Sequence, residues 1–324
     1  MNIFGEYEDY LEKITKEKLQ SIIEDYNSLG SIYNLEKINY KKLKKEDLIR
    51  KISEIKKDYF KYWIMSLDLE DFNVFKQLIL RKNTNEFFNE SREFINWLLD
   101  KNILFQEQEL MLAKDLSILF KDLLKSKEVI KYVKNWNRIY KLVDGIIIAY
   151  GVVSRKYFDI IIGGIENCEI IIPKLEYYYK KDYSIDKKKI VSNKLTNKKR
   201  INNYLKNSKY KMFTNKEFVE MGNSTYHHGI KSYNKFIKML KNNYVFRNSD
   251  VLFVDKNIVI PYLYNSLNEE EIAKKNLQET VETLFEFKGD KLKEKMLEEI
   301  MKIRLEFPLW EYRGFTKMEV ENAE

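Results

Sequence analysis

The chain has 324 residues and a formal net charge of +8, because 58 lysine and arginine residues stand against 50 aspartate and glutamate residues. Its hydrophobic fraction of 44% excludes an intrinsically disordered chain. One cysteine excludes an internal disulfide framework, and two histidines leave little room for a metal centre, so we expect neither a metal nor a cofactor.

The scarcity of turn residues favours helices. The chain has only 10 glycines and 3 prolines, whereas an all-β sandwich needs many turns. We therefore expect a mainly α fold with short β-hairpins, an α+β class built from tandem small helical and winged-helix-like modules. At this length more than one domain is expected, and we divide the chain into segments 1–57, 58–125, 126–212 and 213–324.

The sequence gives no sign of a signal peptide or a membrane segment. The N-terminus is polar and acidic within nine residues. The longest apolar stretches, 145–153 and 160–165, fall far short of the ~20 residues that span a bilayer. Cys168 fits a reducing compartment, so we expect a cytoplasmic protein that does not contact a membrane.

Two short helices are expected in segment 1–57. The first carries an apolar stripe at i, i+3, i+4, i+7 spacing: Leu19, Ile22, Ile23 and Tyr26. Thr15 is placed to cap this helix, and residues 27–30 are expected to end it. The second helix begins near Lys45 and buries a second stripe: Leu48, Ile49 and Ile52.

This segment also resembles a known module. The run YLEKITKEKL at 10–19 is followed by LKKEDLIRKI at 43–52. Over residues 8–57 this is similar to the small helical module at the N-terminus of the transcription termination factor Rho, akin to SAP-type modules. Residues 37–40 here replace the Gly-Tyr-Ser/Thr that usually precedes the second helix. The resemblance implies a module that contacts nucleic acid or serves as a docking domain.

Segment 58–125 has the outline of a winged helix. One helical stripe is formed by Leu69, Phe72, Phe75, Leu78 and Ile79, and the next by Phe94, Trp97, Leu98 and Leu99. Residues 102–106 and 110–112 then predict two short strands. Two helices followed by a small hairpin are typical of this motif.

Segment 126–212 has the outline of a helix-turn-helix. Its strongest helical stripe is Trp136, Ile139, Tyr140, Val143, Ile147 and Tyr150. Gly151 is expected in a left-handed C-cap, and Ser154 is expected to cap a helix over 155–163. Residues 168–173 (CEIIIP) predict a strand. In a DNA-binding interpretation the 155–163 helix enters the major groove, but it is mostly apolar, and we favour a scaffold role for both helices.

The excess positive charge is concentrated in residues 174–216. This basic segment holds 14 lysines and arginines against three acids, a balance of +11 that leaves −3 for the rest of the chain. Interleaved tyrosines suit base stacking beside phosphate contacts. The predicted nucleic-acid-binding residues are Lys187, Lys188, Lys189, Lys194, Lys198, Lys199, Arg200, Tyr204, Lys206, Lys209, Tyr210 and Lys211.

Two alternatives to nucleic-acid binding stay open for the basic segment. It is a solvated lysine surface shaped by codon usage, or it attracts an acidic protein partner. Lysine outnumbers arginine 49 to 9 in the chain, which disfavours base-specific recognition because arginine is the preferred bidentate partner of a base.

Segment 213–324 is expected to be helical and acidic. Thr214 and Glu217 predict a capping box for a helix over 213–221, and another helix covers 234–244. Residues 251–261 (VLFVDKNIVIP) predict a hairpin of two apolar strands. Residues 269–304 predict a long helical stretch broken near Gly289, and residues 269–324 carry a balance of −5.

The C-terminal segment carries a second resemblance. Residues 307–316, FPLWEYRGFT, are similar to a Pro-x-Trp-x-x-x-Gly-Tyr/His-Thr/Ser segment in uncharacterised Firmicutes proteins, some of which share the AYGVVS of 149–154. Many of these proteins end in a cysteine-rich zinc-binding tail of the SEC-C type, whose cysteines are missing here. The resemblance therefore implies a modular layout but neither a zinc site nor a reaction.

No catalytic motif is recognisable, so we expect that the protein is not an enzyme. His227 and His228 are adjacent and lack the i, i+4 spacing of a helical metal pair, so we interpret them as a polar loop dipeptide. The chain has no Gly-rich phosphate loop and no Gly-x-Ser-x-Gly motif. Asp250 and Asp255-Lys256 lack the spacing of a nuclease carboxylate–lysine set, which leaves a metal-dependent nuclease as the weakest hypothesis.

The sequence thus favours an uncharacterised cytoplasmic protein that binds DNA or RNA with low sequence specificity through its Lys/Tyr-rich segment. The alternative is a protein–protein adaptor, or a self-associating protein, in which the acidic C-terminal helices meet the basic segment.

Overall fold

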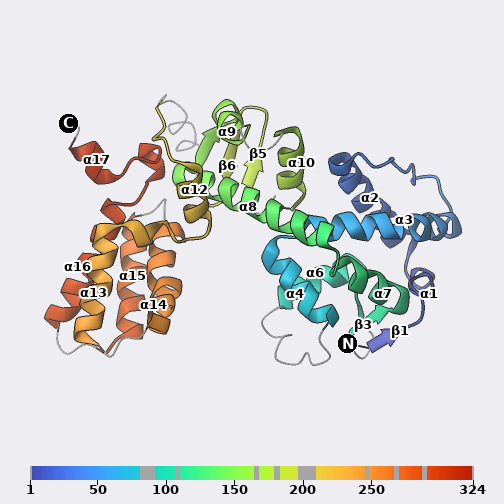
Figure 1. Ribbon diagram of the computed structural model, residues 1–324, viewed down its shortest axis with the longest axis horizontal. Coiled ribbons are helices and arrows are strands. Elements are labelled where there is room, and N and C mark those ends of the chain that lie inside the picture. The colour runs from blue at the N-terminus through green and yellow to red at the C-terminus, as the bar shows by residue number, and fades with distance from the viewer. Residues whose placement is uncertain are drawn as a thin grey trace. The chain divides into compact units, whose positions relative to one another are not determined.

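The computed structural model describes residues 2–80, 92–106, 110–163, 168–178, 183–195, 209–244, 248–265, 270–286 and 290–322. Over these residues the chain is mainly helical with two small β-sheets, so the expected α+β fold class is confirmed. The chain divides into two compact units (Figure 1): the first is Met1–Asn137 with Glu169–Tyr179, and the second is Arg138–Cys168 with Lys180–Glu324. This division has fewer parts than the four segments expected from the sequence, and it splits the expected segment 126–212 between the two units.

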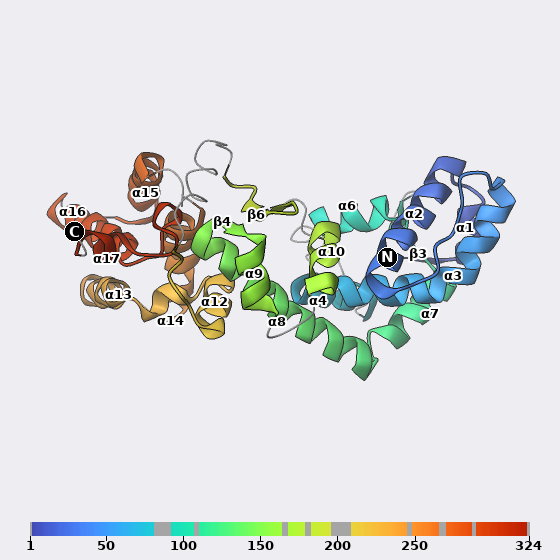
Figure 2. The ribbon, with the colours of Figure 1, turned by 90° about the horizontal axis from the view of Figure 1, so that it is seen from above.

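The first unit combines helices with a three-stranded sheet. Its strands are β1 (Asn2–Phe4), β2 (Phe105–Gln106) and β3 (Leu110–Ala113), in the order β1-β3-β2, with β1 parallel and β2 antiparallel to β3. Its helices are α1 (Tyr7–Leu11), α2 (Lys16–Tyr33), α3 (Lys45–Ser66), α4 (Leu69–Leu80), α6 (Arg92–Asp100), α7 (Lys114–Leu123), the start of α8 (Lys127–Tyr150) and α10 (Cys168–Tyr178). Figure 2 shows α2 and α3 side by side, in agreement with their contacts.

Helices α2 and α3 begin where the sequence predicts and end later. Thr15 Oγ1 accepts the backbone N–H of Lys18 and caps α2, as expected. The predicted end of this helix at 27–30 was wrong. The buried Leu29 and Ile32 continue the apolar stripe, and a helical glycine costs only about 1 kcal/mol, so the helix runs on to Tyr33. Helix α3 continues to Ser66, which puts residue 57 inside a helix.

The core of the first unit is largely aromatic. The fully buried rings of Phe60, Trp63, Phe75 and Phe120 lie on α3, α4 and α7. Phe120 meets Phe60 and Phe75 edge to face at centroid distances of 5.2 and 5.0 Å. Such pairs contribute about 0.5–1.5 kcal/mol each beyond the burial of area. The helices and the hairpin expected in segment 58–125 are confirmed, and β1 adds a parallel strand that was not expected.

The second unit has its own three-stranded sheet. Strands β4 (Val152–Ser154), β5 (Tyr183–Ile185) and β6 (Lys189–Ser192) pair antiparallel in the order β4-β6-β5. The helices are the end of α8, α9 (Arg155–Ile162), α12 (Asn215–Gly222), η1 (Tyr226–Gly229), α13 (Lys231–Asn243), α14 (Asn248–Val254), η2 (Asp255–Val259), η3 (Pro261–Asn265), α15 (Glu270–Leu284), α16 (Asp290–Leu305), η4 (Trp310–Tyr312) and α17 (Lys317–Glu321). Figure 1 shows α13, α15 and α16 running side by side.

The helix-turn-helix outline is only partly correct. Gly151 adopts φ 65° after α8, and Ser154 Oγ caps α9 by accepting the backbone N–H of Tyr157, both as expected. However, β4 lies between these two helices where a tight turn was expected. The strand predicted at 168–173 was also wrong, because these residues begin α10. Ile171, Ile172 and Leu175 are buried at helical spacing there, which overrides the β-propensity of the isoleucines.

The hairpin predicted at 251–261 was wrong as well. The stretch is helical throughout, with π-helical hydrogen bonding in η2 and η3, where Ile260 N–H donates to Asp255 O five residues earlier. The buried apolar residues from 251 to 263 are Val254, Ile258, Val259, Tyr262 and Leu263. Their spacing of 4, 1, 3 and 1 is helical and does not alternate as a strand would. The capping box at Thr214 and the two helices flanking Gly289 are confirmed.

The motif at 307–316 packs into the second unit and contacts helix α8. Trp310 is buried, and its Nε1–H donates to Ile148 O at 2.8 Å. Gly314 adopts φ 87°, a value that favours glycine, and Thr316 caps α17 in a capping box with Glu319. In the described part of the chain, no helix combines the length and the apolar character that a membrane span requires.

Candidate functional site

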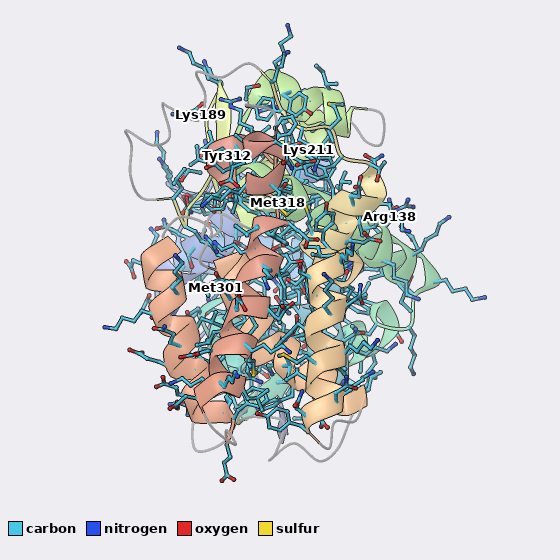
Figure 3. All side chains as sticks on the ribbon, turned by 90° about the vertical axis from the view of Figure 1, so that its left-hand side faces the viewer. Arg138, Lys189, Lys211, Met301, Tyr312 and Met318 are labelled. Atoms are coloured by element: carbon cyan, nitrogen blue, oxygen red, sulfur yellow. The ribbon has the colours of Figure 1, made fainter. Side chains whose placement is uncertain are left out.

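In the described part of the basic segment, three of the predicted lysines lie in the β5–β6 hairpin: Lys187, Lys188 and Lys189. Asp186 Oδ1 accepts the backbone N–H groups of Lys188 (2.7 Å) and Lys189 (2.9 Å), and this side-chain contact shapes the turn. Lys187 and Lys188 are exposed in this turn, and Lys189 is half-buried. Figure 3 places Lys189 and Lys211 at the sheet end of the second unit, and Met301 lies farther down, on α16.

Other predicted contact residues are engaged within the protein. The Tyr210 ring stacks on Tyr157 at 4.3 Å and lies 4.5 Å from the Arg313 guanidinium, and its hydroxyl accepts the Ser154 N–H. Lys211 Nζ donates to both carboxylate oxygens of Glu319, at 2.6 and 2.8 Å. Tyr210 and Lys211 are therefore half-buried parts of the fold, although they lie in the predicted contact set.

The remaining residues of the predicted set divide into two groups. Lys194 and Lys209 are exposed. Lys198, Lys199, Arg200, Tyr204 and Lys206 lie outside the described residues. The structure thus brings together Lys187, Lys188 and Lys189 in one turn.

Lys174, the first cation of the basic segment, is buried in the first unit. Only 3% of its surface is exposed, and its Nζ lies 4.5–5.1 Å from the ring centroids of Tyr132, Trp136 and Tyr33. It also donates to the Tyr132 hydroxyl. Cation–π contacts with these rings stabilise the buried ammonium group. Because it is buried, Lys174 does not contribute to an exposed basic surface.

A pocket of about 460 Å³ lies beside Lys194 in the second unit. Asp144 of α8 lines it and accepts a hydrogen bond from the buried Tyr183 hydroxyl at 2.9 Å. Burial, with the charge of Asp144 second, raises the pKa of Tyr183 well above its ordinary value, so this hydroxyl stays protonated and donating.

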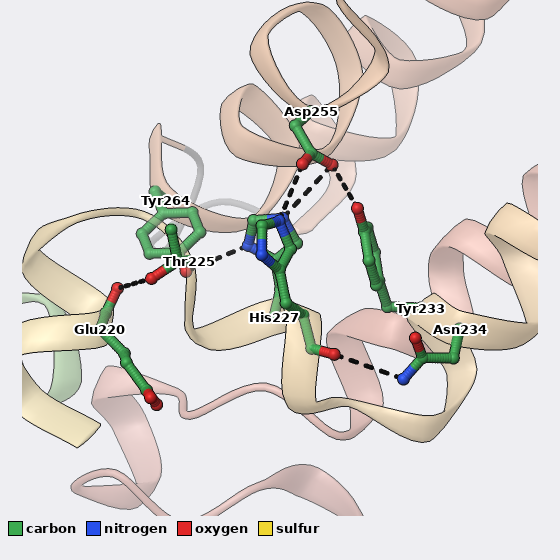
Figure 4. A network of polar contacts seen from close by, with 8 residues as sticks. Glu220, Thr225, His227, Tyr233, Asn234, Asp255 and Tyr264 are labelled. Atoms are coloured by element: carbon green, nitrogen blue, oxygen red, sulfur yellow. Dashed lines mark hydrogen bonds and ion pairs between the residues drawn. The ribbon is translucent and has the colours of Figure 1, made fainter. Parts of the chain in front are cut away.

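A second polar cluster joins four helical elements of the second unit (Figure 4). His227 and His228 lie on η1, Tyr233 lies on α13, Asp255 begins η2 and Tyr264 lies on η3. The turn before η1 is closed by Glu220 O, which accepts the N–H of Thr225 at 2.8 Å. The side-chain amide of Asn234 donates to His228 O at 3.3 Å and holds the far side of η1. These contacts fix the two imidazoles against η2.

Asp255 is the centre of this cluster. Its Oδ1 accepts a hydrogen bond from the Tyr233 hydroxyl at 2.8 Å, and its Oδ2 lies 2.8 Å from His228 Nε2. His227 Nε2 lies 3.3 Å from Asp255 Oδ1, but the direction does not make a hydrogen bond. His227 Nδ1 and the Tyr264 hydroxyl are hydrogen-bonded at 3.2 Å.

Burial and charge set the ionisation of this cluster. His227 is fully buried, and burial lowers its pKa despite the opposing effect of Asp255, which favours a neutral imidazole. Burial acts to raise the pKa of Asp255, but the neighbouring His227, His228 and Tyr233 outweigh it and hold that pKa below its ordinary value. The cluster thus pairs a buried carboxylate with a neutral buried imidazole and a half-exposed one.

The cluster offers ligand atoms as well as hydrogen bonds. His227, His228 and Asp255 each present one such atom, and these atoms lie within 4.8 Å of one another. No motif in the sequence links the histidine pair to Asp255. The signal that could have joined them was the helical spacing of the buried residues between 254 and 263, which places Asp255 on the start of a helix. Tyr233 and Tyr264 had no signal in the sequence.

Comparison of the chain with protein-family models, with curated proteins and with solved structures finds no match.

Proposed function

We propose that the protein is a cytoplasmic nucleic-acid-binding protein of low sequence specificity, and that the β5–β6 turn is the centre of its contact surface. The observation that carries this proposal is the exposure of Lys187 and Lys188 in a turn fixed by Asp186. Within the described part of the chain, neither lysine takes part in an ion pair. Exposed lysines that take part in no ion pair can neutralise phosphates without recognising bases.

The charge of the sequence that follows the turn supports the same proposal. Lys194 and Lys209 are exposed where the described chain leaves β6 and where it resumes. Between them, residues 196–208 add four cations and no acid. The resemblance of residues 8–57 to the Rho module supports nucleic acid as the partner. We leave Tyr210 out of the contact set because its ring is stacked on Tyr157.

The experiment compares salt dependence in a variant with its parent. Lys187→Ala with Lys188→Ala removes two charges from the turn without touching the core. Filter binding to a single-stranded oligonucleotide and to a duplex, each of about 20 nucleotides or base pairs, is measured as salt rises from about 50 to about 300 mM. We expect the log–log slope for the duplex to flatten by about 1.8, because each lost phosphate contact is worth about 0.9.

The matched control removes two exposed lysines elsewhere in the same unit. Lys291→Ala with Lys295→Ala changes the net charge equally on α16. If the slope of log affinity against log salt concentration flattens equally in the control and test variants, net charge and not the turn governs binding. The assignment of the surface is then wrong. If the parent retains neither oligonucleotide at micromolar protein and about 50 mM salt, the function itself is wrong.

A second candidate function is a self-associating or adaptor protein. It is favoured by the Lys211–Glu319 ion pair, in which the acidic C-terminal region meets the basic segment within one chain. In a self-associating protein the same pairing between chains would give a mass that falls with rising salt. Sedimentation equilibrium at low and high salt checks this, and a salt-independent monomer mass would contradict it.

A further inference from the structure

We propose that His227, His228 and Asp255 bind one divalent transition-metal ion, with Zn²⁺ preferred. The site lies in the second unit and does not depend on nucleic-acid binding. No sequence motif predicts this site, because the ligands come from η1 and η2, and His228 and Asp255 are 27 residues apart.

The spacing of the ligand atoms fits a small metal ion. In a tetrahedral site with bonds of about 2.0–2.2 Å, neighbouring ligand atoms lie roughly 3.3 Å apart. The distance from His227 Nε2 to Asp255 Oδ1 is 3.3 Å, and that from His228 Nε2 to Asp255 Oδ2 is 2.8 Å. These two distances run to the two different oxygens of the carboxylate. One ligand atom from each of the three residues lies within 4.8 Å of the others, so small side-chain movements bring both imidazoles and one carboxylate oxygen to a single ion.

The buried nitrogen of His227 supports a cation at this point. Its Nε2 is buried and has no hydrogen-bond partner among the described residues, although it lies close to Asp255 Oδ1. When Nδ1 carries the proton and donates to Tyr264, Nε2 is left as a buried acceptor with no donor, 3.3 Å from a second acceptor, Asp255 Oδ1. A cation bound at this point would supply the partner that Nε2 lacks.

A second set of contacts orients the ligands. The Tyr264 hydroxyl is hydrogen-bonded to His227 Nδ1 at 3.2 Å, and the Tyr233 hydroxyl donates to Asp255 Oδ1 at 2.8 Å. Partners of this kind fix the tautomer and rotation of a metal-ligating side chain. Asp255 also begins a π-helical stretch, a feature that often accompanies functional sites.

The donor atoms determine which metal ion is preferred. The exposure of one ligand leaves the bound ion open to solvent on one side. Two imidazoles and one carboxylate suit Zn²⁺, Co²⁺ or Ni²⁺, whereas Mg²⁺ and Ca²⁺ prefer oxygen ligands throughout. The His228 side chain is 45% exposed, whereas those of His227 and Asp255 are 0% and 6% exposed. Three protein ligands with one solvent-facing side make a site with an open coordination position.

The test uses the full chain, freed of metal with a chelator and titrated with Zn²⁺ alone by calorimetry. We expect one equivalent to bind with a dissociation constant of about 1 μM or below, and Co²⁺ to give the visible absorption of a tetrahedral site. Because the chain has only two histidines, both imidazole signals in an NMR spectrum should shift together as the ion binds.

The informative variant is His228→Ala, since this side chain is half exposed and the metal-free variant should still fold, with a melting temperature lowered only by the loss of one hydrogen bond to Asp255. We expect Zn²⁺ affinity to fall at least 100-fold. Tyr264→Phe removes only a hydroxyl from an orienting residue and should weaken binding about 10- to 100-fold. The control is Asp250→Asn, a carboxylate on the neighbouring α14 and outside the cluster, which should bind as the parent does.

Two results would overturn the proposal. One is the absence of Zn²⁺ binding by the folded parent at about 100 μM metal, which would leave the cluster as a hydrogen-bonded network with the His227 proton on Nε2. The other is Zn²⁺ binding that His228→Ala leaves unchanged, which would place the ion elsewhere. Neither result bears on the oligonucleotide experiment.

Discussion

Asp71 shows at the scale of one residue how burial changes the charge of a carboxyl group. It lies half-buried in the first turn of α4, where its backbone N–H donates to Asp68 Oδ1 at 2.7 Å. Burial, followed by the negative charges of Asp68 and Glu70, raises the pKa of Asp71 from 3.8 to about 7. The folded protein therefore holds a proton on Asp71 that the unfolded chain has released by neutral pH.

This raised pKa predicts that stability falls as pH rises. Between pH 3.8 and about 7 the folded state binds one more proton than the unfolded state at this residue, so the free energy of unfolding decreases through that window and levels off above it. Asp71→Asn removes the titration. We expect the variant to lose less stability than the parent between about pH 5 and about pH 8.5, as measured by urea unfolding.

Asp58→Asn provides the control for this prediction. Asp58 is an exposed carboxylate on α3 of the same unit, and its replacement corrects for the loss of one acidic group in Asp71→Asn. Parallel curves for the parent and Asp71→Asn would show that Asp71 ionises normally and would contradict the burial argument.

At the scale of elements, two glycines bring helices α8 and α12 into unusually close contact. A Cβ on Gly145 would lie 1.7 Å from Phe218 O, and a Cβ on Gly222 would lie 1.9 Å from Lys141 O. Each helix thus presents a glycine to the backbone of the other. No side chain fits at either position without separating the two helices.

We therefore expect Gly145→Ala to destabilise the second unit by about 1–3 kcal/mol, the usual cost of overpacking, even though alanine favours an isolated helix. Urea unfolding followed by circular dichroism measures this change. Gly229→Ala is the matched control, because a Cβ there would meet nothing within 4 Å. Equal stability of Gly145→Ala and the parent would contradict the close contact.

The sequence predicted the helices better than the site. Apolar stripes and the caps at Thr15, Ser154 and Thr214 located most helix starts, because these signals are local. Residues 168–173 and 251–261 were predicted as strands because isoleucine and valine favour strands. Their burial at helical spacing, which depends on distant partners, decided otherwise.

The histidine–aspartate cluster required the fold. The wrong prediction placed Asp255 within a β-hairpin, whereas the helix places it against η1. The basic segment was visible as charge, but sequence could not separate the exposed Lys187 and Lys188 from the buried Lys174 or the ion-paired Lys211.

At the scale of the whole molecule, the two units have separate hydrophobic cores. One cluster of buried residues runs from Tyr7 to Val133, and the other runs from Val152 to Trp310. A change in one core should therefore act first on its own unit. Phe75, fully buried against Trp63 and Phe120, is suited to such a change.

We expect Phe75→Ala to cost the first unit about 3–5 kcal/mol, as is usual for an aromatic core residue. Hydrogen exchange followed by mass spectrometry should then show faster exchange in α3, α4 and α7, with the amides of α13 and α16 unchanged. An equal rise in both units would show that they unfold as one.

The burial of Trp310 also makes it an intrinsic fluorescence probe of the second unit. Of the four tryptophans, Trp63, Trp97 and Trp136 belong to the first unit, so Trp310 alone reports on the second. Its buried indole, hydrogen-bonded to Ile148 O, should emit at short wavelength in the folded state and shift to the red when the second unit opens. With the other three tryptophans replaced by phenylalanine, emission would follow that unit alone. Conversely, Trp310→Phe would leave a chain whose fluorescence follows only the first unit.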